Sequence, residues 1–280
     1  MTESSSPKRS GRTGGGVFFE LLGPVDRPVC LATTGWGTGT GHKVAAIPKA
    51  ITDMFRVLVY DHPGLGGSVS ASHIPADTEG MASTAVDLLD ELNIDRCIVL
   101  GRGGLGGCIA HHLAIQSPDR VIATIAIQSW SHADSFFENQ VLSLMALRQV
   151  NFEDYQRSAA SLCYTPEYFN RHQTEILGPN GPWTDIRDYP NAHRGLMEAS
   201  IGHDTRDNLS RIRSPILIVS TGERDWITGG RMGRDLERRL PRADLLWLEQ
   251  APHAIHTESN EWERLERGIG SWVAERINGQ

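Results

Sequence analysis

Short runs of apolar, often β-branched residues alternate along this chain with longer stretches whose apolar residues recur at helical spacing. The short runs predict buried strands at Val17–Leu22, Val29–Thr33, Arg56–Asp61, Cys97–Leu100, Val121–Gln128, Ile216–Ser220 and Asp244–Leu248. The longer stretches predict helices at Asp77–Asn93, Cys108–Ile115, Gly230–Leu240 and Asn260–Ile277. This alternation favours the α/β class, with a mostly parallel sheet covered by helices on both faces.

The interval from about Ser131 to Asp204 breaks this rhythm, because it contains helical patterns but no β-rich run. Phe136–Val150 and Phe152–Cys163 each carry an apolar stripe. We expect a helical lid over 131–204, inserted into a core made of 16–130 and 205–280, with a ligand pocket between lid and sheet. Aromatic residues suggest an apolar lid, although at helical spacing such residues belong more often to a core. They are Trp130, Phe136, Phe137 and Trp183.

The composition describes a globular protein and argues against two classes of partner. Of the 280 residues 39% are hydrophobic and 22% charged, and no apolar run is long enough to predict a membrane span. The net charge of −7 provides no basic surface for nucleic acid. Met1–Gly15 is polar and lacks the apolar segment of a secretion signal, so we expect a disordered tail and a cytoplasmic location. The four cysteines lack metal-ligand spacing, and we expect buried, reduced thiols.

Glycine turns and polar residues follow several of the expected strands. After one strand, Thr33–Gly37 can present a backbone N–H to a developing oxyanion. Tyr60–Ser68 suits a tight turn, in which His62 is read first as a loop residue. Asp225 and His253 each lie in a turn after a later strand, in the order of an acid followed by a base. A carboxylate that orients an imidazole is the arrangement that general-base catalysis requires.

These segments resemble the α/β-hydrolase superfamily over roughly Val17 to Val273. The chain order of elbow, acid and histidine is the order of that superfamily. Within it, the likeness is to the enol-lactonase-like branch and to the aminoacrylate (carbamate) hydrolases of the Rut uracil-degradation pathway. It rests on Gly35-Trp36-Gly37, Ser129-Trp130 and His253-Ala254. The resemblance implies an eight-stranded α/β-hydrolase fold with a helical lid and no cofactor or metal.

The resemblance also implies roles for individual residues. His253 is the catalytic base and Asp225 the acid that orients it. The backbone N–H groups of Trp36 and Leu105 form the oxyanion hole. The residues expected to contact substrate are Gly35, Arg102 and Trp130, with Arg102 able to pair with a substrate carboxylate if it points into the pocket.

The nucleophile turn departs from the superfamily, because Gly101–Gly107 reads Gly-Arg-Gly-Gly-Leu-Gly-Gly and contains no serine. Counting forward from the strand places the nucleophile position at Gly103, and counting backward from the helix places it at Gly104. We favour Gly104, since the small Gly106 then stands where helix and strand must approach closely. A positive φ costs a non-glycine residue on the order of 1–3 kcal/mol, and glycine removes that strain. Cys108 and Ser129 lie near this turn, but we expect neither of them to act as the nucleophile.

Three functions remain open at this point. The first is a serine-independent hydrolase, in which His253 and Asp225 activate water against a small labile amide, carbamate, imine or lactone. The second is a lyase, isomerase, cyclase or cofactor-free oxygenase that uses His253 as a proton shuttle. The third is a pseudoenzyme or ligand-binding protein, against which the retained acid and base argue. The expected partner is a small molecule, and the sequence leaves a homodimer open beside a monomer.

Overall fold

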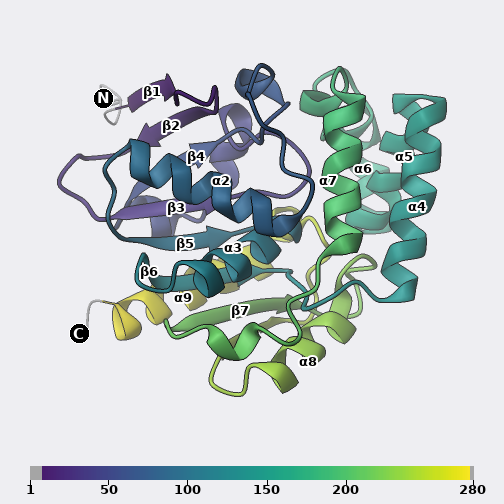
Figure 1. Ribbon diagram of the computed structural model, residues 1–280. Coiled ribbons are helices and arrows are strands. Elements are labelled where there is room, and N and C mark those ends of the chain that lie inside the picture. Colours follow the sequence, from purple (N-terminus) through teal and green to yellow (C-terminus); the bar gives the residue numbers. More distant parts are fainter. Residues whose placement is uncertain (1–7, 278–280) are drawn as a thin grey trace, which may run out of the picture.

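The computed structural model describes residues 8–277, which form one mixed sheet with helices on both faces (Figure 1). The strand order is β1-β2-β4-β3-β5-β6-β7-β8. The strands are β1 Lys8–Arg12, β2 Phe18–Leu22, β3 Val29–Thr33, β4 Arg56–Tyr60, β5 Cys97–Gly101, β6 Val121–Ile127, β7 Ile216–Thr221 and β8 Asp244–Leu248. The β1–β2 and β2–β4 pairs are antiparallel, and the pairs from β4 through β8 are parallel. The eight strands therefore form the α/β-hydrolase sheet.

Alternating side chains of the strands supply separate cores on the two faces of the sheet, and a smaller third cluster packs β6 and β7 against α8. In β5, Val99 belongs to the core under α2 and α3, whereas Ile98 and Leu100 belong to the core under α9. The core helices are α1 Lys49–Thr52, α2 Thr78–Glu91, α3 Leu105–Gln116, α8 Gly229–Arg239 and α9 Ser259–Arg276. Short 3-10 helices span Gly41–Ala46, Gly66–Ser68, Thr184–Ile186, Leu209–Arg211 and Ile255–Thr257. Figure 1 shows α2 and α3 in front of the sheet and α9 behind it.

The segment between β6 and β7 contains the helices α4 Ser135–Val150, α5 Phe152–Cys163, α6 Pro166–Ile176 and α7 Pro190–Gly202. We call residues 131–204 the helical insertion. The helices α6 and α7, which the sequence patterns did not show, both begin with a proline in their first turn, where its missing N–H costs nothing. Figure 1 shows the four helices grouped beside one end of the sheet.

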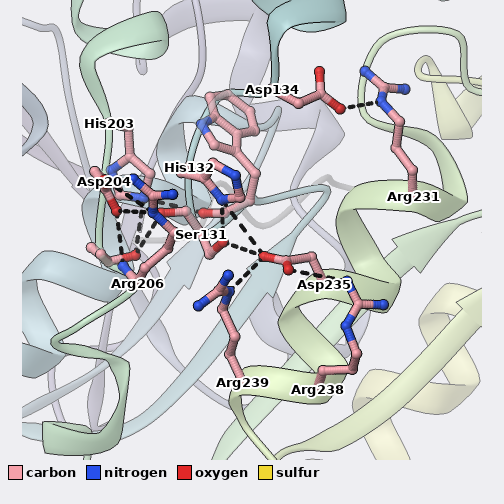
Figure 2. A network of polar contacts seen from close by, with 12 residues as sticks. Ser131, His132, Asp134, His203, Asp204, Arg206, Arg231, Asp235, Arg238 and Arg239 are labelled. Carbon is pink, nitrogen blue, oxygen red and sulfur yellow. Dashed lines mark hydrogen bonds and ion pairs between the residues drawn. The ribbon is translucent and has the colours of Figure 1, made fainter.

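Polar contacts tie the neck of the insertion together and to α8 (Figure 2). The backbone N–H of Thr205 donates to the carbonyl of Ser131 at 2.7 Å, so the entering and leaving segments lie side by side. Asp134 pairs with Arg231 of α8 at 2.6 Å, and Ser131 Oγ donates to Asp235 of the same helix. The insertion is thus anchored to α8, the helix that follows the turn containing Asp225.

The expected disordered tail is wrong for Lys8–Arg12, which form β1. The segment Lys-Arg-Ser-Gly-Arg has no apolar alternation, so no local pattern marks it as a strand. Its backbone pairs with β2 instead, and Lys8 Nζ lies 2.8 Å from a carboxylate oxygen of Glu20. Residues 1–7 lie outside the described part of the chain. Within the described part, no helix is both long enough and apolar enough to span a membrane.

Candidate active site

Asp225 lies in the turn between β7 and α8 and is held by hydrogen bonds to both carboxylate oxygens. Its Oδ1 accepts from the backbone N–H groups of Ile227 (2.9 Å) and Thr228 (3.1 Å). Its Oδ2 accepts from the hydroxyls of Thr221 and Thr228, each at 2.7 Å. Burial by itself would raise the pKa of this carboxyl, but His253 and the hydroxyl donors together hold the pKa well below its usual range. Asp225 is therefore a fixed negative charge at neutral pH.

His253 lies in the turn after β8, with its Nδ1 3.2 Å from Oδ2 of Asp225. Because that carboxylate is ionised, Nδ1 carries the proton and donates it, which leaves the lone pair on Nε2. No group among residues 8–277 hydrogen-bonds this Nε2, and the side chain is 18% exposed. The next residue, Ala254, donates its N–H to the carbonyl of Cys163 in the insertion at 2.9 Å. The pair has the geometry of an oriented general base.

The acid and the base have a third partner, Gln128, which sequence reasoning treated as the last residue of a strand. Its side-chain nitrogen donates to Oδ2 of Asp225 at 2.9 Å and to the carbonyl oxygen of His253 at 3.0 Å. Gln128 is 4% exposed and has a φ of +59°. Its only signal in the sequence is a polar side chain at a strand end, directly before Ser129-Trp130.

The elbow (Gly101–Gly107) joins β5 to α3 through two glycines with left-handed backbone, Gly103 with φ +66° and Gly104 with φ +72°. A Cβ on Gly104 would lie 2.8 Å from the ring of Trp130, which is itself buried. A Cβ on Gly103 would meet nothing closer than the backbone nitrogen of Gly35, at 3.4 Å. A Cβ thus has more room at Gly103 than at Gly104, which is the position that the count from the helix favours for the nucleophile.

The loop after β3 approaches the elbow backbone to backbone. A Cβ on Gly35 would collide with the carbonyl oxygen of Gly103, so only glycine permits this approach. The next residue, Trp36, donates its indole N–H to Ser200 of α7 at 2.9 Å. Leu105 is the first residue of α3, where backbone N–H groups have no intrahelical acceptor. Trp36 thus directly follows the glycine that contacts the elbow, and Leu105 directly follows the second elbow glycine.

Asp185, a residue of the helical insertion, also contacts the β3 loop. The Oδ2 of Asp185 accepts from the backbone N–H and the hydroxyl of Thr38, both at 2.8 Å, and lies 3.1 Å from Nζ of Lys43. Burial alone would raise the pKa of Asp185, but Lys43 and Thr38 lower it. Lys43 in turn lies 3.2 Å from the carbonyl of Trp36. The β3 loop is therefore fixed by contacts that come from the insertion.

Arg102 and His62 support loops. Arg102 is buried, donates to the carbonyl of Lys43 at 2.8 Å, and has its pKa lowered to about 10 by burial. Its contacts point to the β3 loop rather than to His253. His62 is also buried, with Nε2 3.0 Å from the carbonyl of Thr34, in agreement with its reading as a loop residue.

The two nearby candidates for a replacement nucleophile have other partners. Burial raises the pKa of the Cys108 thiol, which contacts the carbonyl of Trp130. The hydroxyl of Ser129 lies 3.2 Å from Nε2 of His111, in the core under α3. Neither residue hydrogen-bonds His253, and all four cysteines are buried and free.

The aromatic residues of the insertion differ in exposure. Trp130 and Phe137 are buried, with ring centroids 4.7 Å apart, whereas Phe136 is 59% exposed. A cavity of about 380 Å³ lies between the insertion and the acid turn and is lined by both sides, including Leu162 and Trp226. Asp225 is one of its lining residues, whereas Trp130 is not and instead packs against Gly104 of the elbow.

Comparison with known proteins places the chain in a class. Residues 31–265 match the model of the alpha/beta hydrolase family, and the chain belongs to that family. It is similar to candidate carbamate hydrolases named RutD. The protein from Caulobacter sp. (strain K31) is 26% identical, with 82% of this chain and 86% of the relative covered. The one from Pseudomonas syringae pv. syringae (strain B728a) is 29% identical, with 84% and 90% covered.

Solved structures agree on the fold. The enol-lactonase from Burkholderia xenovorans LB400 has a TM-score of 0.73 at 19% identity and covers 95% of this chain and 100% of its own. A hydrolase from Pseudomonas aeruginosa PA01 has a TM-score of 0.75 at 19% identity, with 96% and 99% covered. At this identity the likeness establishes the α/β-hydrolase fold. The family match and the relatives identify the chain as a hydrolase.

Proposed function

We propose that the chain is a serine-independent hydrolase that uses His253, oriented by Asp225, to activate water. The observation that carries the proposal is a complete acid–base pair beside an elbow whose two candidate positions are both glycine. An acyl-enzyme on an elbow serine cannot form in such a site. General-base attack by water needs only the histidine, its carboxylate and donors for the oxyanion.

The reaction follows from the positions of these groups. Nε2 of His253 takes a proton from water while the water oxygen bonds to the substrate carbonyl carbon. Asp225 stabilises the imidazolium that results. The backbone N–H groups of Trp36 and Leu105 bind the negative oxygen, aided by the partial positive charge at the N-terminus of α3. When the intermediate collapses, the bond to the leaving nitrogen or oxygen breaks, and Nε2 returns the proton to it.

The substrate class that suits this site is small and labile: a carbamate, amide, imine or lactone. Enzymes stripped of a triad member keep a rate enhancement of roughly 10³–10⁴ from the oxyanion hole and binding, which is sufficient only for reactive substrates. The names of the RutD relatives and of the enol-lactonase support carbamates and lactones. Gly35 and Trp130 form walls of this site, and the helical insertion acts as its lid, whereas Arg102 holds the β3 loop.

Turnover in ¹⁸O-labelled water tests the proposal. With a panel of small amides and lactones, hydrolysis places one solvent oxygen in the carboxylate product, and His253→Ala should lower kcat by roughly 10²–10⁴-fold. Product that contains no solvent oxygen but still depends on His253 would instead assign the proton-shuttle chemistry of a lyase or isomerase. Wild-type-like turnover by His253→Ala would refute both.

A further inference from the structure

We propose that Gln128 is a positioning residue that holds the turn carrying His253 at a set distance from Asp225. The inference rests on the proposed function, because the geometry that it maintains is that of the general base. Gln128 acts through Asp225 and His253. Its side chain hydrogen-bonds these two residues and not the elbow.

The first argument is backbone strain. Gln128 has a φ of +59° without being glycine, a backbone conformation that strains a residue with a side chain. Among the described residues only Asn93 and Trp183 share this feature, and asparagine tolerates it best. Gln128 is 4% exposed and its backbone N–H donates to the carbonyl of Val219 at 2.8 Å, so the surroundings enforce the conformation. A glycine at this position would fold with less strain, and stability alone does not explain a glutamine.

The second argument is the pattern of hydrogen bonds. One amide nitrogen uses its two hydrogens on two different partners, Oδ2 of Asp225 and the carbonyl oxygen of His253. The same Oδ2 also accepts from Nδ1 of His253, so the three residues close a ring of hydrogen bonds. They come from the ends of β6, β7 and β8. No other residue in 8–277 donates to both members of the pair.

The third argument is that the acid does not need Gln128 for its charge. The carboxylate of Asp225 already accepts hydrogen bonds from the hydroxyls of Thr221 and Thr228 and from two backbone N–H groups of its own turn. What the amide adds is the link to the backbone of His253. The loss of Gln128 should therefore appear in the rate, through a misplaced Nε2, rather than in the ionisation of Asp225. A displacement of about 1 Å in such a group costs on the order of 10²-fold in rate.

The variant Gln128→Gly tests the positioning of His253 apart from stability. It removes the two side-chain hydrogen bonds of Gln128 and relieves the backbone strain at the same time. We expect a protein that still folds, because relief of the strain offsets part of the loss of the two hydrogen bonds, with a kcat lowered by roughly 10–10²-fold and a KM that changes far less. Asn93→Gly is the matched control, because it relieves the same kind of strain in a loop after α2. It should keep the wild-type kcat. A Gln128→Gly enzyme with unchanged kcat overturns the proposal.

Two further measurements cover the remaining outcomes. Gln128→Met keeps the shape and the strain but cannot donate, so it must lose kcat as the glycine variant does, and full activity in it also overturns the proposal. The low-field proton resonance of Nδ1–H in His253 needs no substrate. If even the wild type fails to hydrolyse the panel, the proposed function fails, and this resonance decides: its loss in Gln128→Gly and survival in Asn93→Gly support positioning, and its survival in both refutes it.

Discussion

The carbonyl oxygen of Gly103 lies where a Cβ on Gly35 would need space, so at this point the β3 loop and the elbow meet backbone to backbone. This contact brings the segment that contains Trp36 against the elbow. It also explains why a glycine is required at a position whose own φ is not left-handed. The close approach, and not the backbone conformation, excludes a side chain.

Gly35→Ala should accordingly destabilise the protein and abolish activity. The clash is with backbone, which cannot rotate away, so we expect a loss of roughly 1–3 kcal/mol in the free energy of unfolding. Urea denaturation measures it. Gly195→Ala is the control, because nothing lies within 4 Å of a Cβ there and the residue is in the interior of α7. It should gain roughly 0.5–1 kcal/mol. Equal effects of the two substitutions would contradict the close contact.

Serine placed at either glycine of the elbow should give opposite results. At Gly103 a side chain has room toward Gly35, so Gly103→Ser should fold and form a covalent acyl adduct with an activated ester. At Gly104 it would strike the ring of Trp130, so Gly104→Ser should be less stable and not acylated. Intact-protein mass spectrometry after mixing with the ester distinguishes the two. An adduct on Gly104→Ser alone would instead identify position 104 as the nucleophile position, as counting backward from the helix predicts.

Stability should begin to fall at an unusually mild acidity. Burial lowers the pKa of both His111 and His193 to about 3, with His112 adding to the effect on the former and Arg148 on the latter. Above pH 6.5 these imidazoles are neutral in both states, and their contribution to stability is complete. Between about pH 6.5 and 3 the unfolded chain binds protons that the folded protein cannot, so stability is lost as the pH falls.

Urea denaturation at a series of pH values from 7.5 to 5 checks this directly. The variant His111→Gln removes one of the two titrations and keeps a group able to bond Ser129. Its free energy of unfolding should approach that of the wild type as the pH is lowered. A constant difference between the two proteins over this range would contradict the assignment of a depressed pKa to His111.

Asp185 should contribute more to stability than an ordinary surface carboxylate. It is largely buried and bonds Thr38 and Lys43, and Asp185→Ala removes the acceptor of both Thr38 donors and the carboxylate partner of Lys43. Hydrogen bonds to a charged group contribute roughly 1.5–3 kcal/mol, and we expect a loss of this size in urea denaturation. Asp53→Ala breaks the exposed pair with Lys49 and should cost only about 0.3–0.5 kcal/mol. A similar cost for both would mean that Asp185 does not hold the β3 loop.

Much of the fold was predictable because its information is local. β-rich runs and helical stripes located β2 through β8 and the main core helices, since a strand buried on both faces is a short continuous apolar run and a half-buried helix repeats its apolar residues at its own period. The same logic placed Asp225 and His253 at strand ends, and the carboxyl ends of parallel strands meet at one edge of a sheet. Their hydrogen bond follows from that topology.

Other features depend on contacts between distant segments and leave no local pattern. The polar strand β1 exists through its pairing with β2, and Gln128 has its role only because β7 and β8 bring Asp225 and His253 beside it. The sequence by itself thus determined the α/β class, the absence of a serine in the elbow and the positions of Asp225 and His253 in turns after two strands. Only the tertiary structure decided which glycine of the elbow has room for a side chain, because that depends on where Trp130 and Gly35 are packed against it.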